Sequence, residues 1–210
     1  ADGHADMIGM TRAQICDPDL ARKTQEQRPD DIRICVACNQ ACIGHYALGA
    51  PISCIQHPET GRELDYGKRT AAKESREVLV VGGGPAGLKA AAVAAERGHR
   101  VILYEKNTRL GGQVLLAQLL PERSEFGGIV TNLEREARRA GVRILTGVEL
   151  TAERIRTASA EVVIIAAGAV PHIPDLEFSD SAHVVDVWAV ISDEVRCGAG
   201  VIIADWRGDW

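Results

Sequence analysis

Aromatic residues are scarce in this sequence, and no apolar run is long enough to cross a membrane. Aromatic residues make up 4% of its 210 positions. The longest apolar runs, such as VVIIAAGAV at 162–170, fall far short of the roughly 20 residues that a spanning helix needs. The N-terminal ADGHADMIGM lacks the basic start and apolar stretch of a secretory signal. We therefore expect a cytoplasmic protein with no membrane partner.

The sequence also lacks any block of like charge. Its formal net charge is −5, and basic and acidic residues are interspersed along the chain. A partner with a dense negative charge is therefore not expected, which excludes nucleic acid and an anionic membrane surface. Hydrophobic residues make up 46% and charged residues 25%, which are ordinary values for a globular protein. A chain of this length can form one sizeable core or two small ones.

Four blocks can be distinguished along the chain, and the first two are irregular. Residues 1–27 contain a strand-like piece, DMIGMTR, followed by a helix that Asp17 and Pro18 are expected to open. Residues 28–75 contain most of the cysteines and end in a polar run that is typical of an exposed connector. We see no internal repeat.

From residue 76 onward, strands alternate with helices. Residues 76–183 are predicted to form one domain, and 184–210 the truncated start of a second, with an apolar strand at 200–205. The predicted strands of the first are 77–81, 100–105, 142–145 and 161–168, and its helices are 84–98, which Gly98 ends, and 124–140, which Gly141 ends. This alternation predicts an α/β fold, a doubly wound parallel sheet of the Rossmann kind covered on both faces. Both ends of the chain look cut from something larger.

A dinucleotide-binding pattern joins the first predicted strand to the first predicted helix. VLVVGGGPAG places Gly82, Gly84 and Gly87 as G-x-G-x-x-G. The first glycine permits the tight turn, the second lets the backbone approach a pyrophosphate, and the third lets helix and strand pack closely. Glu105 ends the next strand, where its carboxylate could accept a hydrogen bond from a ribose hydroxyl. The pattern alone is weak evidence, but here its strand, helix and acidic residue are all in place.

Two further glycine-containing turns favour FAD over NAD as the ligand. RLGGQV at 109–114 follows the second strand, and AAGAVPHIP at 166–174 ends another. Either alone would be an ordinary turn. Together with the G-x-G-x-x-G pattern they are typical of flavoproteins with two dinucleotide domains, so we add Gly112, Gln113 and Gly168 to the predicted site. FAD or only ADP could fill it.

Four of the six cysteines lie in CVACNQACIGHYALGAPISC, at residues 35–54. Disulfides are the weakest interpretation, because a reducing compartment is expected and the first two cysteines are too close for easy bridging. Structural zinc usually uses two separated pairs of ligands, although His45 and His57 could complete such a set. Three clustered cysteines and one remote cysteine favour a [4Fe–4S] cluster, with zinc as the alternative. The predicted metal ligands are Cys35, Cys38, Cys42 and Cys54. Cys16 and Cys197 lie outside this pattern and are expected to be small buried hydrophobic residues.

Taken together, these motifs resemble a known family. ADMIGMTRAQICDPDLARK, the cysteine segment, the glycine pattern with its following LYEKNTRLGGQ, and AAGAVPHIP occur in the order seen in the 2,4-dienoyl-CoA reductase / trimethylamine dehydrogenase branch of the old yellow enzymes. Family members have an N-terminal TIM barrel with FMN, a [4Fe–4S] cluster and a C-terminal flavoprotein module. The resemblance covers essentially the whole chain and favours the cluster over zinc.

The resemblance implies further roles near the N-terminus. Residues 5–12 would be the last barrel strand, and the turn at Thr11 and Arg12 would bind the FMN phosphate, which is reasonable for an arginine at the end of a barrel strand. Residues 1–27 would then be a remnant of the barrel, whose other strands and substrate-handling residues this chain lacks. The missing barrel polypeptide is thus an expected partner, and no catalytic residue is assigned.

The C-terminal residues depart from the reductase pattern. Aligning VIIADWRGDW on VLVVGGGPAG puts Asp205, Arg207 and Trp210 in place of the three glycines, which disfavours NADPH by charge and bulk. This resembles the amine dehydrogenases, which oxidise N-methylated amines and pass electrons to an electron-transferring flavoprotein. The alternatives are an NAD(P)H-dependent enoate reductase of the 2,4-dienoyl-CoA reductase type and, in another class, a non-redox ADP-binding module with structural zinc.

Overall fold

A four-stranded parallel sheet forms the centre of the molecule. The computed structural model describes residues 3–173, 175, 177, 179 and 182–205. The strands are β1 (Glu77–Val81), β2 (Arg100–Glu105), β3 (Arg143–Thr146) and β4 (Val162–Ile165), in the order β3-β2-β1-β4. The chain therefore moves outward from β1 to β3 and then crosses to the other side of β1. In sheets of this kind, ligands bind beyond the carboxyl ends of the strands where the order reverses, which here is between β1 and β4.

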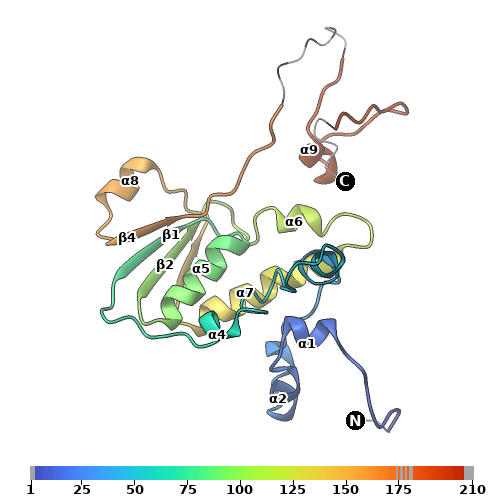
Figure 1. Ribbon diagram of the computed structural model, residues 1–210. Coiled ribbons are helices and arrows are strands. Elements are labelled where there is room, and N and C mark those ends of the chain that lie inside the picture. Colours follow the sequence, from blue (N-terminus) through green and yellow to red (C-terminus); the bar gives the residue numbers. More distant parts are fainter. Residues whose placement is uncertain (1–2, 174, 176, 178, 180–181, 206–210) are drawn as a thin grey trace.

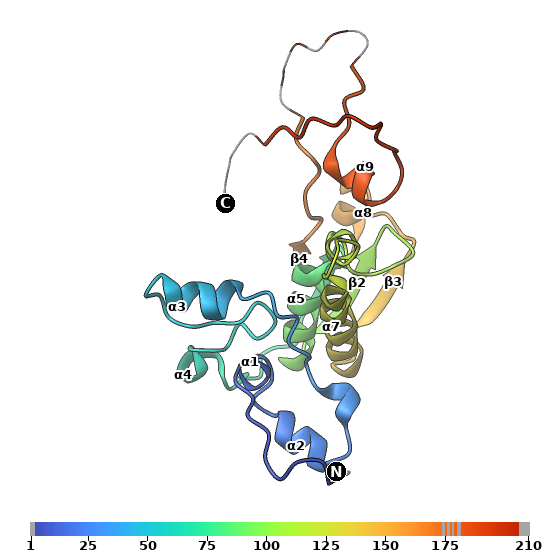
Figure 2. The same cartoon turned by 90° about the vertical axis from the view of Figure 1, so that its right-hand side faces the viewer.

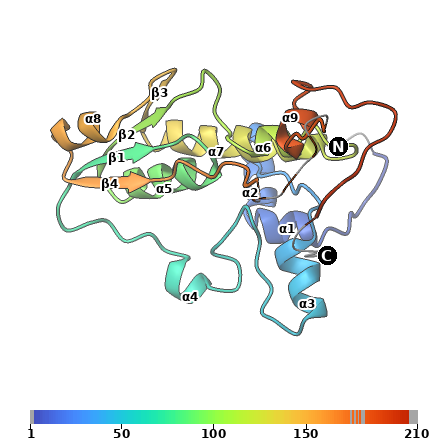
Figure 3. The ribbon, with the colours of Figure 1, turned by 90° about the horizontal axis from the view of Figure 1, so that it is seen from above.

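Two helices cover one face of the sheet. Helix α5 (Pro85–Glu96) packs on β1, β2 and β4, and α7 (Gly127–Arg139) packs against α5 (Figures 1 and 3). The core includes the strand residues that point to this face, such as Val78, Val80 and Leu103. Small buried residues of α5, including Ala91 and Ala92, let the helix approach the strands closely.

The opposite face of the sheet is covered less than the sequence predicts. Within the described part of the chain, Val163 and Ile165 of β4 are 37% and 64% exposed. They alternate with Val162 and Ile164, which pack against the core. The prediction of a sheet buried on both faces is therefore wrong for these residues.

The remaining elements are short. Figure 2 shows the N-terminal helices beside α5 and α7, with α9 at the opposite end of the molecule. These short elements are α1 (Arg12–Cys16), α2 (Leu20–Gln25), the 3₁₀ turn η1 (Pro29–Asp31), the π-helical turn η2 (Gln40–Gly44), α3 (His45–Ala47), α4 (Glu63–Tyr66), α6 (Val114–Ala117), the 3₁₀ turn η3 (Ser124–Phe126), α8 (Ala152–Thr157) and α9 (Val187–Ile191). In the described residues, no helix combines the length and apolar character needed to span a bilayer.

The strands and helices predicted between 77 and 165 are confirmed within a few residues, and both glycine stops are present. Gly98 and Gly141 have φ of +95° and +85°, the left-handed region that ends helices. At the ends of the chain the predictions are wrong. Residues 5–11 and 200–205 form no strand, because a parallel strand needs a neighbour with which to exchange hydrogen bonds. The helix expected to open at Asp17 and Pro18 begins at Leu20.

Candidate functional site

The G-x-G-x-x-G segment forms the tight turn from β1 to α5 that its glycines predict. Gly82 has φ of +110°, and a Cβ there would overlap the carbonyl oxygen of Ala166 at the end of β4. A Cβ on Gly87 would overlap the carbonyl oxygen of Gly82. At Gly84, by contrast, the nearest atom to a Cβ would be 4.0 Å away. Two of the glycines therefore serve packing, and the third keeps open the side from which a pyrophosphate would approach the backbone.

The N-terminus of α5 supplies positive electrostatic potential at this turn. Gly84 is the N-cap, and Pro85 occupies the first turn, where its missing N–H costs nothing. The free N–H groups of the first turn and the helix dipole together favour an anion there. The helix is 12 residues long, and the turn lies between β1 and β4, where the strand order of the sheet reverses. The arrangement is chemically suited to a diphosphate.

Glu105 is buried beside the same turn. It is 6% exposed, and its Oε2 accepts a hydrogen bond from the Gly83 N–H at 2.7 Å. Its Oε1 accepts one from the Asn107 N–H at 2.8 Å. Each carboxylate oxygen keeps a second lone pair, so a ribose hydroxyl could still donate to it. The sequence predicted only the contact of Glu105 with a ribose. It did not predict that Glu105 also fixes the glycine turn to the end of β2.

The two other glycine-containing turns meet the first one. The Gly111 N–H donates to the Gly83 carbonyl at 2.9 Å, and a Cβ on Gly112 would lie 3.3 Å from the Gly84 Cα. The Gln113 Nε2 donates to the Ala169 carbonyl at 3.3 Å, which brings in the turn after β4. Gly168 lies beside Gln113, since a Cβ there would be 3.6 Å from its Nε2. Three segments far apart in the sequence thus converge at the carboxyl edge of the sheet.

The cysteine segment docks on the helical side of this domain. Val36 is 5% exposed and belongs to the main core, and Cys38 packs against that core. Ala37 and Asn39 have positive φ values of 52° and 58°, so the backbone turns sharply on both sides of Cys38. The four predicted ligands are free, half-buried thiols.

The thiols of this segment influence one another's ionisation. Burial raises the pKa of Cys38, and negative charge on Cys42, Cys54 and Cys35 raises it further. A hydrogen bond from Cys16 lowers the pKa of Cys54 to about 5, and the backbone N–H groups of Gln56 and His57 act in the same direction. This hydrogen bond and burial raise the pKa of Cys16. A thiolate at Cys54 is the form that binds a metal.

Four free thiols are the kind of donor that an iron–sulfur cluster takes. Across the residues that the structure describes, no three His, Cys, Asp or Glu side chains are grouped so that they could hold a metal ion. Cys16 is 1% exposed, as predicted for a buried hydrophobic residue. Cys197 is exposed, so that prediction is wrong; it follows α9 in a stretch that packs on no core.

Comparison with known proteins identifies the family of the larger part of the chain. Residues 76–202 match the model of a family described as pyridine nucleotide-disulphide oxidoreductase. The chain belongs to this family. As a member of it, the chain is part of an oxidoreductase, and residues 76–202 include all three converging glycine turns.

Individual relatives of this oxidoreductase confirm the branch predicted from the sequence. A probable N-methylproline demethylase of Rhizobium meliloti is 42% identical over 100% of this chain and 31% of its own length. A solved 2-naphthoyl-CoA reductase is 34% identical, with a TM-score of 0.87 over 93% of this chain and 30% of that one. A histamine dehydrogenase from Rhizobium sp. 4-9 is 39% identical, with a TM-score of 0.73 over 79% of this chain and 25% of that one. The chain thus spans less than a third of the length of these relatives.

In this oxidoreductase, the residues expected near an FMN phosphate have other contacts. The Arg12 NH1 donates to the Asn39 side chain at 2.7 Å, which ties α1 to the cysteine segment. Thr11 precedes α1 without a side-chain capping bond and lines a cavity of about 440 Å³ together with His57 and Thr60. FMN binding by Thr11 and Arg12 stays a prediction. Of the residues aligned on the second nucleotide pattern, Arg207 and Trp210 lie outside the described residues, and Asp205 is exposed.

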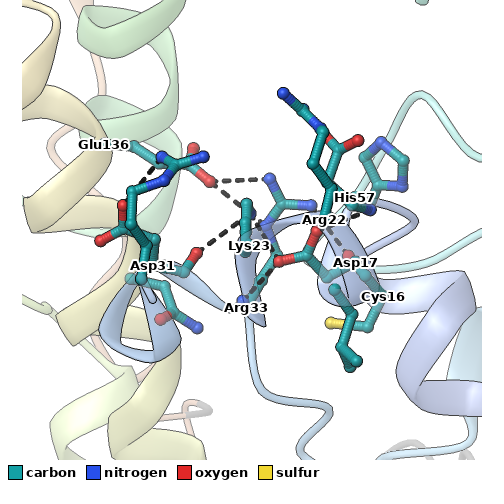
Figure 4. Close-up of polar contacts among 12 residues, drawn as sticks. Cys16, Asp17, Arg22, Lys23, Asp31, Arg33, His57 and Glu136 are labelled. Carbon is teal, nitrogen blue, oxygen red and sulfur yellow. Dashed lines mark hydrogen bonds and ion pairs between the residues drawn. The ribbon is translucent and has the colours of Figure 1, made fainter. Parts of the chain in front are cut away.

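A network of ion pairs between α7 and residues 17–33, which precede the cysteine segment, was not predicted from the sequence. Figure 4 shows Glu136 of α7 reaching the guanidinium of Arg33, and Lys23 reaching Asp17. Burial opposes the charge on Glu136, but Arg33 and Lys89 outweigh it and lower its pKa. Burial also opposes the charge on Asp17, yet Lys23 and the Arg33 N–H lower its pKa. No sequence pattern links residues so far apart, so only the fold could identify this network.

Proposed function

We propose that this chain is the electron-relay portion of a multicentre oxidoreductase. In this proposal FAD, or ADP alone, lies on the glycine turns, and a [4Fe–4S] cluster is bound by Cys35, Cys38, Cys42 and Cys54. FMN and the substrate would be bound by a barrel polypeptide outside these residues. The observation on which the proposal rests is the convergence of the three glycine turns in a domain whose core also packs against a segment of four free thiols.

The chain's own residues would perform distinct tasks toward the nucleotide. The N-terminus of α5 would stabilise the diphosphate, and Glu105 would accept hydrogen bonds from the ribose. Gly84 and Gly112 would keep side chains away from the cofactor. Gln113 would hold the turn at Gly168 in place through its bond to the Ala169 carbonyl. When bound, the flavin and the cluster would supply the exchange of electrons.

Toward the cluster, the chain would supply thiolates in a half-buried loop. The lowered pKa of Cys54 favours its thiolate form, and Cys38 packs against the core, where the surroundings are less polar. Low solvent exposure and hydrogen bonds to the sulfurs are among the factors that set the potential of such a cluster. Zinc on the same thiols remains the alternative, which would make the segment structural.

Within this function we favour the oxidation of N-methylated amines, with an electron-transferring flavoprotein as the external acceptor. The demethylase and histamine dehydrogenase relatives support this, as does the lack of a second G-x-G-x-x-G at 201–210. The second candidate is an NAD(P)H-dependent reductase of activated alkenes or enoyl-CoA compounds. It is favoured by the fold similarity to 2-naphthoyl-CoA reductase.

Metal and cofactor analysis of the anaerobically purified protein tests the relay. We expect about four iron and four sulfide per chain, no zinc, and absorption near ~400 nm from the Fe–S bonds. Heat-released nucleotide, identified by mass, would distinguish FAD from ADP. One zinc without iron would contradict the relay and support the binding module. A matched variant, Cys54→Ser, should lose iron, whereas Cys197→Ser should retain it.

A second measurement separates the two oxidoreductase candidates. The full-length protein is mixed anaerobically with NADPH or with an N-methylated amine, and bleaching of the flavin absorption is followed. Bleaching by the amine alone supports the dehydrogenase. Bleaching by NADPH without amine would contradict it and favour the reductase.

A further inference from the structure

Arg33, two residues before the first cysteine of the segment, makes more polar contacts than its position suggests. Its side chain is 14% exposed. The Nε and NH2 groups donate to Glu136 Oε1 at 3.2 and 2.8 Å, and NH1 donates to the Cys16 carbonyl at 2.8 Å. The Arg33 backbone N–H also donates to Asp17 Oδ2 at 2.7 Å. One residue thus joins the start of the cysteine segment to α7 and to the end of α1 (Figure 4).

Glu136 extends this connection to the helix that begins at the glycine turn. Its second oxygen, Oε2, accepts from Lys89 Nζ at 3.0 Å. Lys89 lies in α5, whose first turn is the predicted diphosphate site. A short, partly buried chain of charges therefore leads from the cysteine segment through α7 to α5. The side chains of Glu136 and Lys89 are 24% and 17% exposed.

The other end of the segment is anchored as well. Gln56 is 6% exposed, and its Nε2 donates to the Ile34 carbonyl at 2.7 Å, so the two ends of the segment are joined. Its Oε1 accepts from Asn132 of α7 at 3.5 Å. Farther along, Arg69 bridges Glu59 at 2.7 Å and Glu96 of α5 at 2.8 Å. The cysteine segment is thus held on both sides by contacts with α5 and α7, the two helices that cover the sheet.

We propose that Arg33, Glu136 and Lys89 are positioning residues that fix the separation and orientation of the cysteine segment relative to the dinucleotide turn. This inference rests on the proposed function, because two redox centres exchange electrons at a rate that falls steeply as their separation grows. A partly buried ion pair adds little net stability over apolar packing of the same volume. What it supplies is a defined geometry, since the rigid, planar guanidinium of Arg33 places two donors on one oxygen of Glu136 and a third on the Cys16 carbonyl.

Helix α7 offers a matched control for this proposal. Glu134 and Arg138 form an ion pair of similar length, 2.7 Å, but their side chains are 34% and 58% exposed, and among the described residues their charged groups pair with each other instead of with Arg33. Glu134→Gln removes the same charge from the same helix as Glu136→Gln. A difference between the two variants therefore reports the contacts with Arg33 and Lys89 and not the loss of a carboxylate from α7.

The experiment uses the full-length protein with its native cofactors. Hydrogen–deuterium exchange of peptides covering 33–42 is compared among the unaltered protein, Glu136→Gln and Glu134→Gln, with iron and nucleotide contents measured on the same samples. Where the released nucleotide is FAD, electron transfer between the flavin and the cluster is followed after photoreduction by a deazaflavin; where it is ADP, the exchange comparison alone decides. We expect Glu136→Gln to speed exchange several-fold and, with FAD bound, to slow internal electron transfer, because the two centres are then held less firmly at their native separation. Iron content and the cluster potential should change little.

Arg33→Lys provides a second variant, which keeps the charge but loses the fork, and an intermediate effect is expected. If Glu136→Gln fails to fold, Arg33→Lys measured in the same way decides the question. Unchanged exchange and transfer in Glu136→Gln, or equal changes in Glu134→Gln, would overturn the positioning role. Absence of iron from the unaltered protein would instead contradict the proposed function. The exchange comparison would then still test whether Glu136 holds the cysteine segment against α7.

Discussion

Gly87 has no room for a side chain, because a Cβ there would overlap the carbonyl oxygen of Gly82. We expect Gly87→Ala to lower the free energy of unfolding by about 1–3 kcal/mol, as overpacking does, and to reduce bound nucleotide. Urea unfolding and nucleotide content measure the two effects. Gly128→Ala is the control, since its Cβ meets nothing within 4 Å and alanine favours a helix over glycine by about 0.5–1 kcal/mol. Equal midpoints for both variants would contradict the close approach of β1 and α5.

Glu105 is a second residue whose role can be tested singly. In Glu105→Gln one of the two backbone donors, Gly83 or Asn107, faces an amide nitrogen instead of an oxygen. A buried N–H left without an acceptor costs about 1–3 kcal/mol, so we expect a loss of stability of that order and weaker nucleotide binding. Isothermal titration with ADP and urea unfolding test this. If binding and stability match the unaltered protein, the carboxylate does not organise the turn.

At the scale of elements, the ion pairs between α7 and the N-terminal segment should make stability depend on pH. The pKa values of Glu136 and Asp17 are lowered in the folded protein from their usual 4.5 and 3.8. Their stabilising contribution is therefore complete above these values and is lost as the pH falls through the lower folded values. We expect urea midpoints to fall between about pH 5 and pH 3.

The variant Glu136→Gln isolates the part of this dependence that comes from α7. It should lower the free energy of unfolding by about 1–3 kcal/mol at pH 7, where Arg33 and Lys89 lose their partner, and by less at pH 3. Glu134→Gln should change stability by less than about 1 kcal/mol, because its pair with Arg138 is exposed. A loss in Glu136→Gln that stays constant from pH 7 to pH 3 would contradict the linkage.

Elements near the dinucleotide turn could be predicted from the sequence because local signals and tertiary structure agree there. Glycine stops, apolar strands and the G-x-G-x-x-G turn each constrain the backbone within a few residues. The strands predicted at 5–12 and 200–205 failed because strand formation depends on a neighbour that local sequence does not reveal. Arg33 and Glu136 are 103 residues apart, so their contact follows from docking and not from any local pattern.

For the whole molecule, the exposed face of the sheet predicts self-association of the 210-residue polypeptide. Within the described residues β4 pairs only with β1, and Val163 and Ile165 present apolar surface on the side away from α5. An unpaired strand edge and an apolar patch both favour association in water. We expect sedimentation velocity to detect oligomers that grow with concentration.

The double variant Val163→Thr/Ile165→Thr should shift this distribution toward the monomer, because both substitutions keep a β-branched side chain and remove apolar surface. Leu64→Thr is the control: Leu64 is fully exposed on α4, away from the sheet, so its replacement should leave the distribution unchanged. A monodisperse monomer at every concentration would mean that the sheet face does not attract other surfaces. An equal shift in Leu64→Thr would assign the association to general surface hydrophobicity, and the sheet face would then have no special part in it.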